Sequence, residues 1–395
     1  MNEQLRKLLN IAEKKEKLVL GLMSGTSLDG LDIALCNISG AGKETTIDLL
    51  EFTSVSYEDA FRHTLMNVCF KADARLEEIC LINKEIAITH SDIILKTLHH
   101  WKVDAGSIDL IASHGQTVFH QPNTTIGHTT LQLGDGDIIA NKTGIITVSD
   151  FRQKHISAGG EGAPLAAYGD FLLFQNQSED RFLINIGGIS NLTFIPSNAT
   201  FEQVICSDIG PGNKLMDLWM QQHFEGMSQD TDALVAARGK VNFKLLNQLQ
   251  SDPFFELPFP KSTGPELFSM KYLTTSMHCC DADSMRHEDV LATLNLFTAN
   301  CIFDAVEQLM RNPEQTKIFI SGGGSKNPLL MSYLANHFDY LKINITDELS
   351  IPADAKEAML FALLANECVA GNKEVFDNGA KTHPAVSMGK ISLPY

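Results

Sequence analysis

The sequence contains no run of about 18 or more apolar residues, which is the length that a helix needs to cross a bilayer. We therefore expect no membrane-spanning helix and no membrane partner. The segment Met1–Gly21 is basic and amphipathic, but it lacks the apolar centre and the small-residue cleavage site of a secretory signal. We expect it to form either a short surface helix or a partly ordered lead-in.

Basic residues are also scarce, because 31 Lys and Arg stand against 48 Asp and Glu, giving a formal net charge of −17. Nucleic acid requires clustered positive charge, so we expect no nucleic-acid partner. A small anionic substrate is compatible with this balance, since local donors and metal ions can hold it.

The eight cysteines lack the paired spacing of a disulfide framework. Four of them lie in apolar periodic segments, as buried reduced thiols do, namely Cys36, Cys206, Cys301 and Cys368. These features favour a cytoplasmic protein. With 395 residues, 44% of them hydrophobic, the chain is long enough for two domains that each have their own core.

The most informative stretch is Leu18–Asn37, in which an apolar run, a turn and a second apolar run follow one another. The turn Ser24–Gly30 holds two glycines, hydroxyl side chains and Asp29, and such a turn can bring backbone N–H groups close to phosphate oxygens. It is not a Walker A loop, because no Gly-Lys-Ser/Thr follows and the next element is a strand. The alternative is an ordinary hairpin turn.

The stretch Arg181–Ile195 repeats this pattern, with Gly187 and Gly188 at its tip. Two such units, one in each half, indicate an internal duplication. Two glycine tips that face each other across a cleft would clasp a triphosphate from both sides. A third glycine turn, Gly322–Gly324, follows the predicted strand Lys317–Ser321 and would let the backbone pack against a flat ring such as adenine.

Polar residues follow two further predicted strands. The strand Ile108–Ser113 runs into His114, which is either a base near a ligand or a capped structural residue. The strand Val204–Asp208 ends in a carboxylate before a glycine turn. Asp208 has the alternative role of a helix cap, but Asn213 stands next to the following helix and serves as the cap, which leaves Asp208 free for chemistry.

Arg152 has two alternative roles. Its guanidinium either contacts a substrate oxygen or forms a structural ion pair with Asp150 or Glu161. The glycine cluster Gly159–Gly162 follows it and is our candidate for the link between two domains.

The sequence predicts little about the roles of two later segments. The Pro-rich stretch Phe254–Phe268 is either a lid or a surface excursion. The segment His278–His287 contains His and Cys, but its spacing matches no tetrahedral zinc pattern, so we expect a loop there.

The run GLMSGTSLDGLDIAL at Gly21–Leu35 resembles the N-terminal signature of the anhydro-N-acetylmuramic acid kinases. Further matches follow in the order of that family and span roughly the whole chain: SHGQT at Ser113–Thr117, SDFR at Ser149–Arg152, AGGEGAPL at Ala158–Leu165, NIGGISNLT at Asn185–Thr193, DIGPGN at Asp208–Asn213, ATLNLFTA at Ala292–Ala299, SGGG at Ser321–Gly324 and DAKEAMLFALLA at Asp354–Ala365. Their joint occurrence is far more specific than any single motif.

The resemblance implies an α/β fold of the two-domain actin-like ATPase type, with ribonuclease H-like domains and a central nucleotide and substrate cleft. We expect the first domain at residues 1–150 and the second, with the catalytic acid and the adenine site, at residues 151–383. The tail from about 384 to 395 would return to the first domain. The resemblance also implies ATP, Mg²⁺ and an anhydro sugar, and it leaves room for a homodimer.

The resemblance also assigns roles to residues. Asp208 matches the base of the family, and Arg152 and Glu357 match positions near the sugar. The phosphates would be held by Gly25, Thr26, Ser27, Leu28, Asp29, Gly30, Leu31, Asp32, Gly187 and Gly188, and adenine by Gly322, Gly323 and Gly324. The candidate sugar-binding residues are His114, Gln116, Asn185 and Gly210, and the candidate magnesium ligand is Asp29.

The family hydrolyses the anhydro ring and phosphorylates the freed 6-oxygen, giving N-acetylmuramic acid 6-phosphate in cell-wall recycling. A 1,6-anhydro sugar has no free 6-hydroxyl, so water must attack the anomeric carbon while a carboxylate takes its proton. Three alternatives are a levoglucosan kinase, whose sugar lacks the N-acetyl and lactyl groups, a non-catalytic actin-like ATP-binding protein, and a filament-forming protein like actin.

Overall fold

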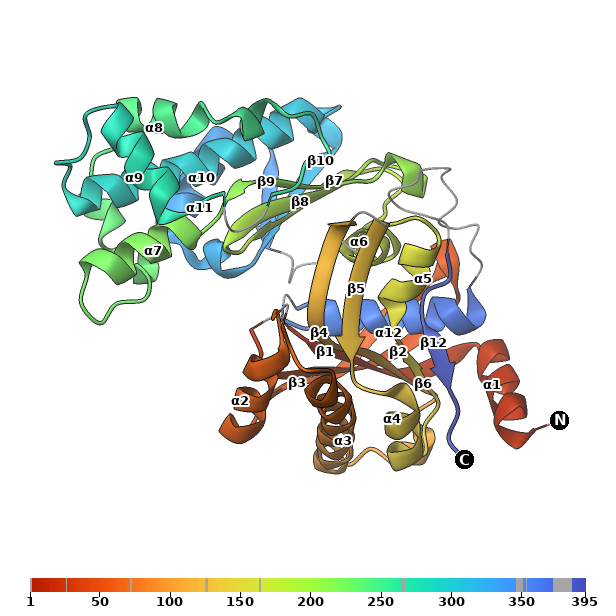
Figure 1. Cartoon of the computed structure of the whole chain (residues 1–395). Helices are drawn as coiled ribbons and strands as arrows, with labels where there is room; N and C mark the ends of the chain where they lie inside the picture. Colours follow the sequence, from red (N-terminus) through yellow and green to blue (C-terminus); the bar gives the residue numbers. More distant parts are fainter. Residues whose placement is uncertain are drawn as a thin grey trace. The chain divides into compact units, whose positions relative to one another are not determined.

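The computed structural model describes residues 2–25, 27–71, 73–124, 127–162, 165–263, 267–345, 351–352, 354–371 and 386–395 (Figure 1). The chain divides into two compact units. Unit 1 comprises Met1–Leu173, Thr200–Glu202 and Asp354–Tyr395, and unit 2 comprises Phe174–Ala199 and Gln203–Ala353.

Unit 1 is built on a mixed sheet with the strand order β12-β6-β4-β1-β2-β3, which β5 extends by pairing with β4. Strands β1, β2 and β3 form an antiparallel meander, whereas β4 and β6 run parallel to β1. The strands are β1 (Glu16–Ser24), β2 (Gly30–Ser39), β3 (Thr46–Ser56), β4 (Leu110–Thr124), β5 (Gly127–Leu133), β6 (Thr147–Ser149) and β12 (Lys390–Ser392).

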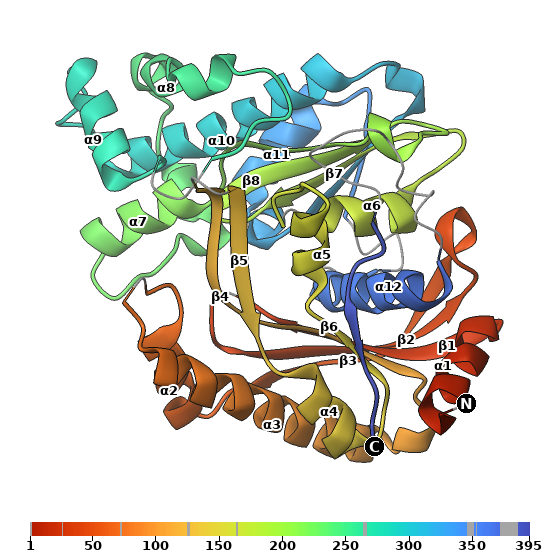
Figure 2. The same ribbon diagram turned by 45° about the vertical axis from the view of Figure 1, so that its right-hand side comes forward.

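Helices cover both faces of this sheet. They are α1 (Glu3–Glu13), α2 (Asp59–Val68), α3 (Leu76–Trp101), α4 (Gly136–Thr143), α5 (Phe151–Ser157), α6 (Ala166–Phe174) and α12 (Lys356–Ala370). Helix α12 packs on β1, β2 and β4 on one face, and α3 and α4 lie on the opposite face (Figure 2). Because both faces are covered, β1 is apolar and buried along most of its length.

Unit 2 repeats the sheet of unit 1. Its strands are β7 (Asp180–Ile186), β8 (Ile189–Ile195), β9 (Ile205–Pro211), β10 (Thr316–Ser321) and β11 (Lys342–Ile345), in the order β11-β10-β7-β8-β9. Here β7, β8 and β9 are the antiparallel meander, and β10 and β11 run parallel to β7. The order and directions match β6-β4-β1-β2-β3, which confirms the predicted duplication and the two-domain α/β fold.

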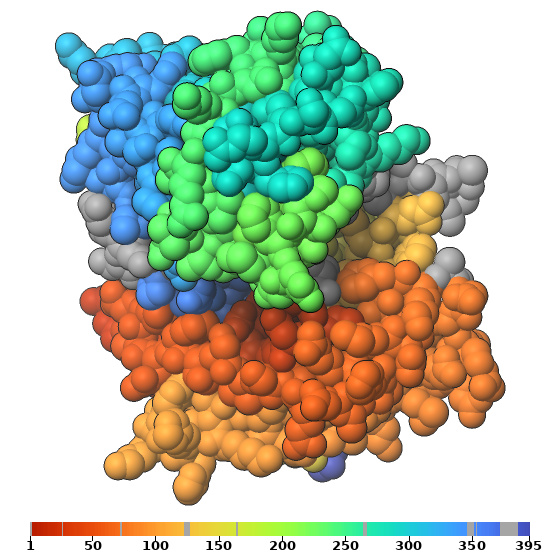
Figure 3. All heavy atoms as spheres, turned by 90° about the vertical axis from the view of Figure 1, so that its left-hand side faces the viewer, coloured from red at the N-terminus to blue at the C-terminus, as the bar shows by residue number. Residues whose placement is uncertain are grey.

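The helices of unit 2 are α7 (Lys214–His223), α8 (Phe243–Gln250), α9 (Met270–Cys279), α10 (His287–Leu309) and α11 (Pro328–His337). The segments from α7 to α9, green to cyan in Figure 3, form much of one face of this unit. Helix α10 has the length and composition of a membrane span, but 78% of its most apolar window is buried inside the structure, as in a core helix.

The structure differs from one expectation about a single element and agrees with another. The strand that we expected to end at Ser113 continues as β4 to Thr124, and the positive φ of Gly115 (73°) marks the irregularity between its two parts. The short helix expected within Met1–Gly21 is present as α1, which Asn2 caps by accepting hydrogen bonds from two backbone amides.

The division of the chain also falls elsewhere than expected. The first unit extends to Leu173 rather than to residue 150, so the glycine cluster Gly159–Gly162 lies inside unit 1. Helix α12, expected in the second domain, belongs to unit 1, because its apolar side chains pack on β1, β2 and β4. The C-terminal segment pairs with β6 of the same unit through β12.

Candidate active site

The loop between β1 and β2 carries the first group of candidate phosphate-binding residues, of which Thr26 lies outside the described residues. Leu28 has a left-handed backbone conformation (φ 56°) although it is not a glycine, and its side chain is buried. A Cβ on Gly30 would lie 2.6 Å from the carbonyl oxygen of Val55, so only glycine fits there. A strained conformation of this kind persists because the surroundings hold it, and it is typical of ligand-binding loops.

Four buried side chains form a hydrogen-bonded chain beneath this loop. The Ser24 hydroxyl donates to Oε1 of Gln116 at 2.5 Å and accepts from the Tyr57 hydroxyl at 2.8 Å. The Tyr57 oxygen is also 2.8 Å from Nε2 of His90, which must donate because Tyr57 gives its own hydrogen to Ser24. Nε2 of Gln116 donates to the carbonyl oxygen of Gly25 at 3.1 Å. Gln116, a candidate for sugar binding, therefore holds the loop backbone.

His114 supports Arg152. Nε of Arg152 donates to Nε2 of His114 at 3.0 Å, so that Nε2 carries no hydrogen, while Nδ1 of His114 donates to the carbonyl oxygen of Gly115 at 2.9 Å. Burial and the charge of Arg152 lower the pKa of His114 to about 3. The imidazole is neutral and its lone pair is occupied, so this geometry favours a structural role over that of a base.

Arg152 is a half-buried cation with open donors. Asp150 pairs with Lys390 instead of Arg152, and no ion pair joins Arg152 to Glu161 in the part of the chain that the structure describes. Burial lowers the pKa of Arg152, and the carboxylate of Glu357 opposes this effect. The terminal nitrogens of Arg152 donate no hydrogen bond to any described residue. They are suited to an oxyanion.

Glu357 lies in the first turn of α12, and its side chain is exposed. A Cβ on Gly21 would lie 2.0 Å from the carbonyl oxygen of Ala358, so glycine at this position of β1 allows α12 to approach the sheet. Loss of solvent around the carboxyl group raises the pKa of Glu357; the charge of Lys356 opposes this rise, the Asp32 carboxylate adds to it, and Arg152 opposes it. The site in unit 1 therefore combines one half-buried cation with two carboxyl groups.

No group of three or more His, Cys, Asp or Glu side chains that would hold a metal ion occurs among the described residues, the segment His278–His287 included. Asp29 accepts a hydrogen bond from the Ser27 hydroxyl at 2.7 Å. Burial raises the pKa of Asp32, and the neighbouring charges of Asp29 and Asp354 add to the rise. Mg²⁺ is usually bound by one or two carboxylates together with substrate phosphates. Asp29 and Asp32 fit such a shared role.

The glycine turn of unit 2 lies against the start of α7. The amides of Gly212 and Lys214 donate to the carbonyl oxygen of Gly188, and the amide of Asn213 donates to that of Gly187 at 2.8 Å. The N-terminal end of α7 therefore adjoins the turn, where it favours an anion. Asn213 occupies the cap position as predicted, but its side chain forms no cap hydrogen bond. Sequence reasoning missed Lys214, a cation beside this turn, because no motif marks it.

The glycines expected to contact adenine pack on the end of β7. A Cβ on Gly322, whose φ is 83°, would lie 2.6 Å from Oδ1 of Asn185, and a Cβ on Gly324 would lie 2.2 Å from Cγ2 of Ile186. The structure thus brings Gly322, Gly324 and Asn185 together. Gly210, a second candidate for sugar binding in unit 2, lies in β9.

Asp208 is half-buried in β9, next to a β-bulge at Ile209 that interrupts the pairing with β8. Its Oδ2 accepts from the Thr263 amide at 2.8 Å and from the Ser262 hydroxyl at 3.4 Å. Its own amide donates to the carbonyl oxygen of Lys261 at 3.0 Å. Burial raises the pKa of Asp208, and the two hydrogen bonds to Oδ2 oppose this rise. Oδ1 accepts no hydrogen bond from the described residues, so it is available to a water molecule.

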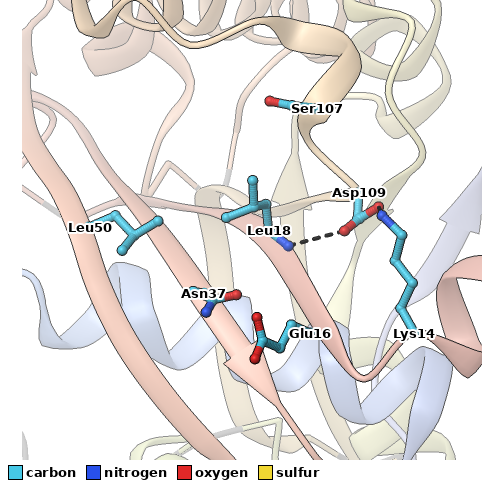
Figure 4. A pocket seen from close by; sticks show the side chains of 7 residues that line it. All are labelled: Lys14, Glu16, Leu18, Asn37, Leu50, Ser107 and Asp109. Carbon is cyan, nitrogen blue, oxygen red and sulfur yellow. Dashed lines mark hydrogen bonds and ion pairs between the residues drawn. The ribbon is translucent and has the colours of Figure 1, made fainter.

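Unit 1 also has a cavity of about 410 Å³ away from these residues. It is lined by Lys14, Glu16, Leu18, Asn37, Leu50, Ser107 and Asp109. Figure 4 shows the Asp109 carboxylate between Nζ of Lys14, at 2.6 Å, and the amide of Leu18, at 3.1 Å. None of the candidate site residues lines this cavity, and Leu18 is about 20 Å along β1 from Ser24 at ~3.3 Å per residue.

The structure thus defines a protein of two duplicated α/β units, with a glycine-tipped hairpin in each copy and a half-buried carboxyl group in the second. The sequence model of the family described as anhydro-N-acetylmuramic acid kinase matches residues 17–393. The chain belongs to this family.

Curated relatives agree with this assignment. The chain is 46% identical over 400 residues to an anhydro-N-acetylmuramic acid kinase of Pseudoalteromonas atlantica, with all of both chains covered. It is 38% identical to that of Caldanaerobacter subterraneus, covering 98% of this chain and 100% of the relative. It is 34% identical to that of Bacillus cereus, covering 95% of this chain and 99% of the relative.

Solved structures resemble the chain only distantly. One is the activator of the 2-hydroxyisocaproyl-CoA dehydratase from Clostridium difficile with bound ADPNP, with a TM-score of 0.43 and 11% identity, covering 91% of this chain and 98% of that one. Another is a ROK family glucokinase from Streptomyces griseus in complex with glucose and AMPPNP, with a TM-score of 0.32 and 12% identity, covering 88% and 97%. At these scores the neighbours establish no function for this chain.

Proposed function

We propose that this enzyme uses ATP and water to convert 1,6-anhydro-N-acetylmuramic acid into N-acetylmuramic acid 6-phosphate. Family membership across residues 17–393 gives the kinase and the class of sugar. The observation that carries the reaction chemistry is Asp208, whose Oδ2 is held by the Thr263 amide while Oδ1 remains open.

The role of Asp208 follows from the structure of the substrate. The 6-oxygen of the sugar is part of the anhydro bridge, so a base has no hydroxyl proton to remove from that oxygen. Oδ1 of Asp208 instead takes a proton from a water molecule, whose oxygen attacks the anomeric carbon. The bond between that carbon and the 6-oxygen breaks, and the 6-oxygen attacks the γ-phosphorus in line, releasing ADP. The raised pKa of Asp208 makes its carboxylate a stronger base.

Arg152 and Glu357 act on the sugar in this proposal. The open terminal nitrogens of Arg152 would neutralise negative charge that develops on the 6-oxygen as the bridge opens. His114 fixes the orientation of this guanidinium, and Glu357 keeps the half-buried cation charged. His114 and Gln116 would then support the site without touching the sugar.

The phosphates of ATP would be bound by two elements. One is the strained β1–β2 loop, and the other is the glycine turn Gly187-Gly188 with the N-terminal end of α7, whose helix dipole favours an anion. Asp29 and Asp32 would hold Mg²⁺ jointly with the phosphates, and the ion would supply charge neutralisation during phosphoryl transfer. The glycines Gly322–Gly324 would contact adenine.

The proposal is tested with 1,6-anhydro-N-acetylmuramic acid, ATP and water labelled with heavy oxygen. We expect ADP release that depends on the sugar, and a sugar phosphate carrying the label at the anomeric carbon and none in the phosphate. Labelled inorganic phosphate in place of a labelled sugar phosphate would mean that water attacks phosphorus, and this result would contradict the proposal. Faster turnover of levoglucosan would indicate a levoglucosan kinase. ATP binding without sugar-dependent ADP release would indicate a non-catalytic protein.

The cellular setting remains a prediction. A cytoplasmic location is supported by eight free cysteines, and the expected absence of nucleic-acid partners rests on the net charge of −17. The homodimer also stays a prediction.

A further inference from the structure

The segment after the short 3₁₀ helix Pro253–Glu256 runs along the exposed edge of the sheet in unit 2. Strand β9 is the last strand of this sheet, so its outer backbone groups have no partner strand. The segment takes that place. The Asp208 amide donates to the carbonyl oxygen of Lys261 at 3.0 Å, and the Lys261 amide donates to the Ser207 hydroxyl at 2.9 Å. The segment is therefore attached to β9 at the residue that carries the base.

The side chain of Lys261 attaches the same segment to the interior. Its ammonium donates to the carbonyl oxygens of Phe254 at 3.1 Å and of Phe255 at 3.3 Å, in the 3₁₀ helix. Three aromatic rings surround it, with centroids 4.7 Å (Phe254), 5.8 Å (Phe255) and 5.0 Å (Phe259) from Nζ. Each such cation–π contact contributes on the order of 0.5–2 kcal/mol, depending on how far water is excluded.

The aromatic rings around Lys261 are themselves fixed by the core of unit 2. Phe254 is buried and packs edge-to-face on Phe268, which has no exposed surface. Phe255 contacts Phe297 of α10, the most deeply buried helix of the unit. Lys261 thus connects a rigid core to the backbone beside Asp208.

We infer that Lys261 is a positioning residue for Asp208. Its ammonium fixes the segment 259–263 so that the Thr263 amide holds Oδ2 of Asp208 and leaves Oδ1 directed at water. This inference rests on the proposed function of Asp208 as the base. It also gives the Pro-rich stretch, expected as either a lid or a surface excursion, a third role.

The test compares three purified variants with the unmodified enzyme in sugar-dependent ADP release. Lys261→Met removes the charge and keeps an apolar stem of similar length, Lys261→Arg keeps the charge, and Lys271→Met removes an exposed lysine of α9 as the matched control. We expect Lys261→Met to lower kcat about 10- to 100-fold, because misplacement of a reacting group by about 1 Å has effects of this size. ATP affinity should change less than about twofold. Lys261→Arg should retain most activity, and Lys271→Met all of it.

The pH profile separates positioning from a merely structural role. Hydrogen bonds from Thr263 and Ser262 lower the pKa of Asp208. If Lys261→Met loosens them, that pKa rises, and the acid limb of kcat against pH moves to higher pH. A structural role alone would lower thermal stability without moving this limb.

A double variant provides the second criterion. In an Asp208→Asn background, Lys261→Met should lower the residual rate no further, because the residue it positions is already gone. A further 10- to 100-fold loss there, or unchanged kcat and pH profile in Lys261→Met alone, would overturn the inference while leaving the proposed function standing. An unmodified enzyme without sugar-dependent ADP release would overturn the proposed function, and with it this inference.

Discussion

In the proposed mechanism, Asp208 is a carboxylate that its surroundings prepare for a single task. It lies beside a bulge in an edge strand, where the pairing with β8 shifts. One oxygen is committed to the Thr263 amide, so the direction of the other is fixed. Burial raises the pKa of Asp208, and the hydrogen bonds from Thr263 and Ser262 oppose this rise. Orientation and basicity therefore arise from the same contacts.

The first prediction at this scale concerns Asp208→Asn. Asparagine keeps the size and can keep the contact with Thr263, but it cannot accept the proton of water. We expect kcat to fall about 10²- to 10⁴-fold, the usual contribution of a general base, with ATP affinity unchanged. Rate and nucleotide affinity are measured by ADP release and calorimetry. Turnover within a factor of a few of the unmodified enzyme would remove Asp208 from the mechanism.

Sequence patterns predicted the charged residues of the candidate site but not the environment of these residues. Asp208, Arg152 and Glu357 all lie in motifs that could be identified directly. The choice between a base and a structural role for His114 depended on a contact with Arg152, 38 residues away, that no local pattern encodes. Lys261 and Thr263 lie in the Pro-rich stretch whose role the sequence left open. Their contacts beside Asp208 were not predicted, since a backbone amide or a lone lysine in a loop has no sequence signature.

At the scale of an element, the β1–β2 loop likewise combines a turn that the sequence predicted with supporting contacts that it did not predict. The glycines and hydroxyls of Ser24–Gly30 predicted a ligand-binding turn, and the structure contains a loop in a strained backbone conformation there. Its support is a buried chain of Tyr57, Ser24, Gln116 and His90, drawn from four separate elements. Because the hydrogen-bonded partners lie up to 92 residues apart in the sequence, local sequence analysis could not predict these contacts.

We predict that Tyr57→Phe weakens ATP binding while leaving the sugar site intact. The change leaves Nε2 of His90 and an acceptor site of Ser24 without partners, which costs about 1–3 kcal/mol of stability when the groups stay buried. We expect the loss of these hydrogen bonds to make the β1–β2 loop more mobile. KM for ATP should therefore rise about 3- to 10-fold, with a smaller effect on KM for the sugar. Tyr340→Phe, at an exposed tyrosine of unit 2, is the matched control. Equal effects on both KM values would argue against a specific role of the loop in ATP binding.

At the scale of the whole molecule, the duplication was predictable and the path of the chain was not. Two glycine-tipped hairpins in the sequence indicated two related halves, and the two sheets share one strand order. Helix α12 returns to unit 1 because its apolar surface packs on β1, β2 and β4, and because Gly21 allows close approach. Hydrophobic periodicity predicts local secondary structure, so it cannot specify a tertiary contact between segments more than 300 residues apart.

The acid sensitivity of the fold follows from its buried histidines. Burial lowers the pKa of His90 to about 4, whereas an unfolded histidine titrates at 6.5. Below pH 6.5, His90 therefore binds a proton in the unfolded chain but not in the folded protein. The contribution of neutral His90 to the stability of the fold is thus fully present above pH 6.5 and is lost as the pH falls. Between pH 7 and pH 5 this loss amounts to about 2 kcal/mol for one such histidine. Carboxyl groups with raised pKa values, such as Asp217 at about 6, act in the opposite direction.

A matched substitution isolates the histidine from these carboxyl groups. His90→Gln places an amide nitrogen near the position of Nε2, keeps the contact with Tyr57 and does not titrate. We expect the free energy of unfolding of His90→Gln to fall about 2 kcal/mol less between pH 7 and pH 5 than that of the unmodified protein. Hydrogen exchange of core amides in β1 and β4 measures this difference within unit 1. The exposed His100→Gln should leave the pH dependence unchanged. If His90→Gln and His100→Gln gave the same slope, His90 would be charged in the folded protein, and the hydrogen-bonded chain beneath the β1–β2 loop would have to be assigned differently.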